Sequence, residues 1–307
     1  MRIVIVGAGV VGTATGKGFA RRGHAVMFVD TDARRVDALR REGAAASSEL
    51  DLRGPAATVM LSVPTPSSSA GYDLSAVRNA AAAVGEALRS AEELSTVVLR
   101  STVAPGTLEG TVQPIIEQRS GQRAGEGFAL ASNPEFLRAE CALEDFLAPW
   151  MTVVASRSKR TRERLAELYR PFGGTLELFA DPAEAEFVKL VHNVFNATKI
   201  SFFNEVWSLA SHLGLDAHRI AATVASSAEA SWNPGYGIRG GRPYGGECLP
   251  KDVSGFLGFA LELGLDAPMA AATRAVNERL IREADQPTID LRSPVEPDPG
   301  PAGVPRR

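Results

Sequence analysis

The chain has 307 residues, of which 45% are hydrophobic and 22% charged, and its formal net charge is −3. This balance is typical of an ordinary globular protein and argues against a nucleic-acid partner, which would need a basic surface. No apolar run could span a bilayer, the N-terminus begins directly with a strand pattern, and two cysteines are too few for a disulfide framework. We therefore expect a cytoplasmic protein of two domains without a membrane partner.

Strand and helix patterns alternate through the first half of the chain. An apolar strand at 1–6 leads into a glycine turn and a helix that stops at Gly23, and a second strand follows at 24–30. Helices are expected at 32–42 and 74–90. The segment 57–66 is expected to be a buried strand that ends in a proline-rich loop, and further apolar strands are expected at 95–100, 127–133, 150–156 and 174–179. The alternation predicts an α/β domain over 1–182, built on a doubly wound parallel sheet.

The pattern becomes helical near Asp181. An Asp-Pro start and a stop at Gly214 delimit one long helix, which a shorter helix at about 216–228 and one or two helices at about 252–285 follow. The sequence thus predicts a smaller, all-helical domain over 183–285 with a long central helix. The proline-rich remainder, 286–307, is expected to be disordered.

A glycine fingerprint follows the first strand. In the pattern GxGxxG, Gly7 permits a tight turn, Gly9 lets the backbone approach a pyrophosphate, and Gly12 lets helix and strand pack closely. The N-terminus of the next helix attracts phosphate charge. A strand before these glycines and a helix after them are the context of a Rossmann dinucleotide-binding unit. The predicted contacts in this turn are Gly7, Gly9, Val10, Val11 and Gly12.

Asp30 ends the second strand, about twenty residues after the fingerprint. A carboxylate there can accept hydrogen bonds from the ribose hydroxyls of the adenosine and would repel a 2′-phosphate. The predicted cofactor is therefore NAD. Arg34 and Arg35 leave NADP open as an alternative, and a Rossmann domain that has lost its nucleotide is the other.

Reactive side chains occur at two places in the second half. Cys248 lies between glycines and a Lys251–Asp252 pair, so it has the neighbours of an activated nucleophile, although a lone cysteine is more often a small buried hydrophobe. On the long helix, Lys189 and Asn193 lie four residues apart on one face. That face is either a solvated polar stripe or, given its apolar flanks, part of a partly buried site.

Six motifs in order give the chain a specific resemblance. They are GAGVVG at 7–12, VPTP at 63–66, STVAPGT at 101–107, SNPEFLRAECALEDF at 132–146, EFVKLVHNVFNATKISFFNE at 186–205 and GGECLPKD at 245–252. From Met1 to about Asp285 the chain resembles the UDP-glucose/GDP-mannose dehydrogenase family, which oxidises the alcohol of a nucleotide sugar to a carboxylate with NAD.

The resemblance implies roles for individual side chains. Cys248 matches the nucleophile that holds the substrate as a thiohemiacetal and then a thioester. Lys189 and Asn193 match the groups that stabilise negative charge on the reacting oxygen. Asp252 and Glu135 match acid or base candidates. Thr102 matches a hydroxyl at the site, and the residues expected beside the cofactor are Pro64, Ser101, Thr102 and Lys251.

The sequence departs from the family pattern at three places. Ala139 stands where an acidic residue commonly follows FLR, and Glu140 comes one position later. The run Pro149–Met151 replaces a charged segment. Family members also continue into a second Rossmann-like domain that covers the nucleotide. We therefore expect a short form, for which either another chain supplies the contacts to a nucleotide sugar or the substrate is a smaller sugar or nucleoside.

Three functions remain open at this point. The first is a four-electron oxidation of a primary alcohol through Cys248. The second is a two-electron oxidation or an epimerisation without a thioester, and the third is a non-catalytic NAD-binding protein. Because the long helix carries more apolar surface than a small domain covers, we also expect a homodimer. No metal site is predicted.

Overall fold

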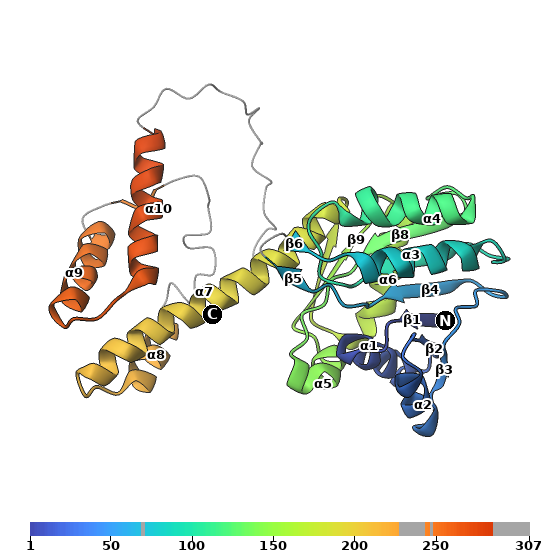
Figure 1. Cartoon of the computed structure of the whole chain (residues 1–307), viewed down its shortest axis with the longest axis horizontal. Helices are drawn as coiled ribbons and strands as arrows, with labels where there is room; N and C mark the ends of the chain where they lie inside the picture. The colour runs from blue at the N-terminus through green and yellow to red at the C-terminus, as the bar shows by residue number, and fades with distance from the viewer. Residues whose placement is uncertain (69–70, 227–242, 246–247, 285–307) are drawn as a thin grey trace, which may run out of the picture. The chain divides into compact units, whose positions relative to one another are not determined.

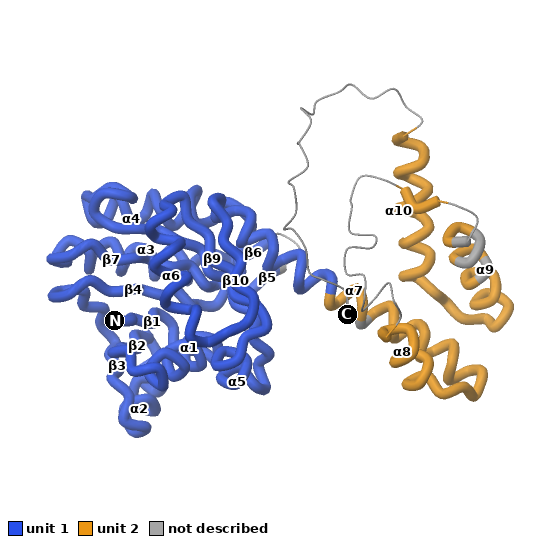
Figure 2. The backbone as a smooth tube through the Cα atoms, turned by 180° about the vertical axis from the view of Figure 1, so that it is seen from behind, with its two compact units in different colours: residues 1–195 blue, residues 196–307 orange. Residues whose placement is uncertain are grey.

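A computed structural model describes residues 1–68, 71–226, 243–245 and 248–284 (Figure 1). The chain divides into two compact units, residues 1–195 and 196–307, and the division falls inside its longest helix (Figure 2). The predicted proline-rich tail lies outside the described residues, as do residues 227–242 and 246–247, which precede the helices predicted at about 252–285. The predicted domain limits of 182 and 285 stay predictions.

The first unit contains an eight-stranded sheet. Its spatial order is β10-β9-β8-β7-β4-β1-β2-β3, with a separate two-stranded hairpin of β5 and β6. The strands are β1 (Arg2–Val6), β2 (Ala25–Val29), β3 (Ala45–Ser47), β4 (Ala57–Leu61), β5 (Ser67–Ser68), β6 (Gly71–Tyr72), β7 (Ser95–Leu99), β8 (Phe128–Ser132), β9 (Met151–Ala155) and β10 (Thr175–Phe179).

The sheet order confirms the predicted doubly wound topology. From β1 the chain builds outward through β2 and β3, then returns to the other side of β1 with β4. This reversal creates a switch point at the carboxyl ends of β1 and β4, which is where such sheets bind ligands. One pair differs from an all-parallel sheet, since β9 meets β8 antiparallel at Ser132 and Ala155. Apolar alternation does not encode strand direction, and the short strands β3, β5 and β6 were not predicted.

Helices cover both faces of this sheet. They are α1 (Val10–Arg21), α2 (Ala33–Arg41), α3 (Ser75–Leu88), α4 (Gln113–Ser120), α5 (Ala142–Leu147) and α6 (Lys159–Tyr169), with short turns at Leu108–Val112, Ala139–Cys141 and Arg170–Phe172. Side chains alternate along β1, so Val4 and Val6 join the core under α3 and α4, whereas Ile3 and Ile5 join the core under α1, α2, α5 and α6. Burial on both faces explains why these strands are apolar throughout.

The predicted long helix is α7 (Pro182–His212), whose first part, through Phe195, belongs to the first unit. The second unit adds α8 (Ala217–Ala225), α9 (Cys248–Glu262) and α10 (Pro268–Ala284). Its small core includes Leu209 and Ala260, and the Glu205 carboxylate accepts hydrogen bonds from the backbone at the start of α10. Across the described part of the chain, no helix has the length and apolar character that crossing a membrane requires.

Candidate active site

The glycine turn after β1 is shaped by contacts inside the protein at two of its three glycines. Gly7 has a φ of +96°, and a Cβ there would lie 2.5 Å from the carbonyl oxygen of Ser62. A Cβ on Gly12 would lie 1.9 Å from the carbonyl oxygen of Gly7. A Cβ on Gly9 would meet nothing within 4 Å. Packing therefore requires Gly7 and Gly12, whereas Gly9 keeps open the space through which a pyrophosphate approaches the start of α1, so this turn fits a dinucleotide.

The contrast between Gly9 and Gly12 gives a direct prediction. Gly9→Ala is expected to leave the free energy of unfolding within about 0.5 kcal/mol and to weaken NAD binding at least about tenfold, because the added methyl occupies the ligand's space. Gly12→Ala is expected to cost about 1–3 kcal/mol of stability through overpacking. Urea unfolding and calorimetric titration with NAD measure the two effects. Unchanged NAD affinity in Gly9→Ala would contradict this account of the turn.

Asp30 is buried directly after β2, and it makes contacts within the protein that the sequence did not indicate. Its carboxylate oxygens accept hydrogen bonds from the backbone N–H of Ala8 at 2.7 Å and of Asp32 at 2.8 Å, and Arg35 lies 3.4 Å away. The side chain thus holds the glycine turn in place. Because each carboxylate oxygen can accept more than one hydrogen bond, Asp30 keeps the capacity for the predicted ribose contact.

The predicted contacts after β4 and β7 are tied to each other by side-chain hydroxyls. The Ser101 hydroxyl accepts from the N–H of Val63 at 3.0 Å and donates to the Val63 carbonyl at 2.7 Å. The Thr65 hydroxyl donates to the carbonyl of Thr102 at 2.6 Å. Pro64, between these two anchors, is exposed. The structure therefore brings Pro64, Ser101 and Thr102 together at the carboxyl edge of the sheet, beside the turn that Gly7 makes against Ser62.

A buried ion pair joins two of the predicted catalytic residues. The Lys189 ammonium on α7 lies 3.2 Å from a carboxylate oxygen of Glu135, and both side chains are nearly inaccessible, at 7% and 13% exposed. The second oxygen of Glu135 accepts from the backbone N–H of Leu137 at 2.7 Å, and the ammonium lies 5.3 Å from the ring centre of Phe136. Lys189 is thus held in a nearly inaccessible position, where Glu135 is its carboxylate partner among the described residues.

Asn193 lies one turn beyond Lys189, but its environment differs. The side chain is exposed, and its amide oxygen lies 3.3 Å from Nδ1 of His192. The His192 ring stacks on Trp150 and meets Phe136 edge to face. The polar face predicted on this helix is therefore buried at Lys189 and open at Asn193. Trp150, part of one of the departures from the family pattern, adds an aromatic ring that contacts both Phe136 of the Glu135 loop and His192 of α7.

Glu186, which was not among the predicted site residues, connects α7 to the loop that carries Thr102. This carboxylate is buried and accepts from the backbone N–H of Gly106 at 2.6 Å and of Leu108 at 2.9 Å. Burial raises the pKa of Glu186, and these hydrogen bonds oppose the rise. The sequence could have indicated Glu186, because it lies three residues before Lys189 and therefore on the same face of the helix.

The loop that carries Glu135 is also held at Arg138, by an ion pair and a backbone hydrogen bond to Asp145, which we call the Asp145 clamp. Asp145 accepts from the backbone N–H of Arg138 at 2.8 Å and from its guanidinium at 2.7 and 3.0 Å. These contacts lower the pKa of Asp145 to about 2 from an ordinary value of 3.8. Ala139 and Glu140, another of the three departures from the family pattern, are exposed beside Arg138.

Asp145→Asn is expected to lower the free energy of unfolding by about 1 kcal/mol at neutral pH, because it removes the ion pair with Arg138 and weakens one backbone hydrogen bond. The loss is small because the Arg138 side chain is exposed and solvent screens the pair. A lowered carboxyl pKa stabilises the fold above the unfolded pKa and loses that effect as the pH falls through the folded pKa. The stability difference from the parent should therefore shrink between about pH 4 and pH 2. Urea unfolding at several pH values measures it, with the exposed Glu144→Gln as control. A difference that does not change with pH would count against the clamp.

A buried polar network lies under both loops. Arg100, which directly precedes Ser101, is 3% exposed and donates to the side chain of Asn133 and, at 2.9 Å, to the hydroxyl of Tyr169. Asn133 in turn donates to the carbonyl of Val153 at 2.6 Å. The network joins β7, β8, β9 and α6 immediately before the Thr102 and Glu135 loops, so it fixes where both loops start.

The remaining predicted residues belong to the second unit. Cys248 is the first residue of α9, and Lys251 and Asp252 follow on the same helix; their side chains lie outside the described set. The backbone just before them is anchored, because the buried Asn277 side chain accepts from the N–H of Tyr244 at 2.7 Å and donates to its carbonyl at 3.1 Å. The grouping of these three residues with Lys189 and Glu135 stays a prediction.

The sequence and the structure of this chain match those of known dehydrogenases. The NAD binding domain of the UDP-glucose/GDP-mannose dehydrogenase family matches residues 1–57 and 44–173, and the family's central domain matches 183–279. GDP-mannose 6-dehydrogenase of Azotobacter vinelandii is 34% identical, covering 92% of this chain and 70% of the relative. UDP-glucose 6-dehydrogenase of Haloferax volcanii is 31% identical, with 91% and 70% covered. A ternary complex of GDP-mannose dehydrogenase from Pseudomonas aeruginosa superimposes with a TM-score of 0.85 at 31% identity, covering 92% of this chain and 70% of that one.

Proposed function

Since this chain belongs to the UDP-glucose/GDP-mannose dehydrogenase family and is an NAD-dependent oxidoreductase acting on CH–OH groups, we propose that it oxidises a nucleotide sugar at its primary alcohol. The product is the carboxylate, and the oxidation proceeds in two steps. The relatives' names contain both GDP-mannose and UDP-glucose. We further propose a cytoplasmic location, because the two cysteines suit a reducing compartment.

The observation that carries the proposal is the buried Lys189–Glu135 pair. Oxidation of an alcohol requires loss of a proton from oxygen and of a hydride from carbon, and bound NAD supplies the hydride acceptor. A fixed ammonium stabilises the negative charge that develops on the oxygen, and its effect is large where water is excluded. Glu135, held by Lys189 and Leu137, is the proposed group that exchanges a proton at that oxygen. Asn193 supplies a neutral donor one helical turn away.

The second oxidation is proposed to proceed through Cys248. Addition of its thiol to the aldehyde carbon forms a thiohemiacetal. Loss of the hydroxyl proton and of a second hydride, for which a second molecule of NAD would be the acceptor, gives a thioester. Water then attacks the thioester carbon, the C–S bond breaks, and the carboxylate leaves as the thiol is restored. Asp252 is the proposed acid or base for the water, and Thr102 the proposed hydroxyl contact from the β7 loop.

Incubation of the protein and NAD with GDP-mannose and, separately, UDP-glucose tests this function. We expect NADH formation with one of them and a product mass that corresponds to the uronic acid. An aldehyde or an epimer as the final product would favour the two-electron alternative. Absence of NADH formation with both substrates, in protein that binds NAD, would favour the non-catalytic alternative.

A homodimer through α7 is the proposed assembly. Phe187, Val191, Val194 and Phe195 recur at helical spacing on α7, and each is between 48% and 64% exposed. Such a stripe is stabilised when another apolar surface covers it. Light scattering coupled to size exclusion should give twice the chain mass, and Val194→Glu should shift it toward one chain mass. A single-chain mass for the parent protein would contradict the dimer.

A further inference from the structure

A large cleft lies at the amino edge of the sheet in the first unit. Its volume is about 710 Å³, which is within the usual range for small-molecule sites, roughly 300–1,000 Å³. Its lining includes Ala56 and Leu94, which directly precede β4 and β7. These strands run parallel to β1, so the cleft opens at the opposite edge from the glycine turn that follows β1. The cleft is therefore separate from the cofactor-binding turn.

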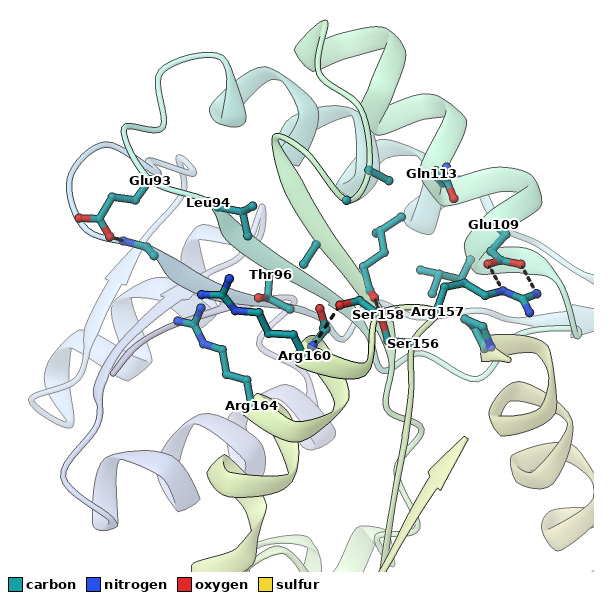
Figure 3. Close-up of a pocket in the computed structure, with 18 residues that line it drawn as sticks. Glu93, Leu94, Thr96, Glu109, Gln113, Ser156, Arg157, Ser158, Arg160 and Arg164 are labelled. Atoms are coloured by element: carbon teal, nitrogen blue, oxygen red, sulfur yellow. Dashed lines mark hydrogen bonds and ion pairs between the residues drawn. The ribbon is translucent and has the colours of Figure 1, made fainter. Parts of the chain in front are cut away.

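Two arginines on α6 make one side of this cleft positively charged. Arg160 and Arg164 lie one helical turn apart, and Figure 3 shows their side chains extended next to each other at the cleft. Neither guanidinium forms an ion pair with a described residue. By contrast, Arg157, also in the lining, pairs with Glu109 at 2.8 Å and with Asp181 at 3.0 Å. Among the described residues, the cleft thus presents two neighbouring cations that pair with no carboxylate, on a chain whose net charge is −3.

The rest of the lining combines polar side chains with an apolar wall. Leu94, Leu108 and Leu130 contribute to the wall next to the arginines, and Glu93 at one end of the cleft accepts a hydrogen bond from the N–H of Ala56 at 3.0 Å. Two guanidinium forks match the charge and the oxygen geometry of a phosphate dianion. The apolar wall matches a carbon ring or chain attached to it. We propose that this cleft binds a small organic phosphate, held by Arg160 and Arg164.

Calorimetric titration of the full chain with phenyl phosphate tests the proposal, with NAD kept saturating so that the glycine turn is filled. Arg160→Gln/Arg164→Gln is expected to weaken binding at least about tenfold, because charge-assisted hydrogen bonds to the phosphate are lost. The matched control is Lys159→Gln/Arg170→Gln, which removes the same charge from exposed positions of the same segment outside the cleft. This control should bind as the parent does.

Two further probes determine which part of the ligand matters. Inorganic phosphate should bind at least about tenfold more weakly than phenyl phosphate, because it leaves the apolar wall uncovered. Benzoate should also bind more weakly, because it carries a single charge. The proposal would be overturned by an absence of phenyl phosphate binding, by equal losses in the two double variants, or by equal affinity for phenyl phosphate and either probe.

Discussion

Cys248→Ala is expected to lower the rate of carboxylate formation by at least about 10³-fold while NADH formation continues to the aldehyde stage. In the proposed mechanism the first hydride loss does not involve Cys248, whereas the second requires the thiol addition that the variant lacks. Mass spectrometry of the product, together with NADH absorbance, measures both steps. The expected pattern is about one NADH per substrate consumed, with the aldehyde or its hydrate as product.

Cys141 provides a matched control within the same chain. It lies next to Asp145 in the Glu135 loop, and burial raises the pKa of its thiol, so it is a poor nucleophile at neutral pH. Cys141→Ala should therefore leave the yield of carboxylate unchanged. If Cys141→Ala abolished carboxylate formation and Cys248→Ala did not, the assignment of the nucleophile would be wrong.

Lys189→Met is expected to reduce kcat by at least about 10²-fold, because the oxygen of the reacting alcohol loses its fixed cation. It should also lower the free energy of unfolding by about 3–5 kcal/mol, since the buried Glu135 carboxylate is left without its partner. Methionine preserves the volume of the side chain, so a cavity does not explain the effect. Activity is measured below the melting temperature of the variant, and stability by urea unfolding.

A double variant separates the two effects. In Lys189→Met/Glu135→Gln neither charge remains, so most of the lost stability should return while kcat stays low. Lys159→Met removes a lysine that is 81% exposed on α6 and should change neither quantity. Recovery of activity together with stability in the double variant would show that Lys189 acts on the fold alone.

The fold was largely predictable because its signals are local. Apolar runs, the glycine turn and the Asp-Pro start of α7 each depend on neighbouring residues, and all three were found where expected. The direction of β9 was not predictable, since it depends on a pairing with β8 that no local pattern encodes. For the same reason, the two hydrogen bonds from Asp30 to backbone N–H groups could not be inferred from its position alone.

The residues predicted for the site received their roles from the family resemblance, and their local environments could not be predicted from the sequence. Spacing placed Lys189 and Asn193 on one face, but burial of the first and exposure of the second depend on what packs against α7. Glu135 enters the pair from a distant loop, which only tertiary structure brings to the helix. Glu186 and Asp145, which hold the loops of Thr102 and Glu135, have no family role in the sequence and were found through their backbone hydrogen bonds.

The number of NADH molecules formed per carboxylate tests the central claim most directly. With NAD in excess and a limiting amount of the nucleotide sugar that the protein accepts, NADH absorbance and product mass are followed to completion in one reaction. Two oxidations at one carbon predict two NADH per substrate and a uronic acid as the final product. One NADH per substrate, with an aldehyde or ketone as the final product of the parent enzyme, would contradict the proposed function.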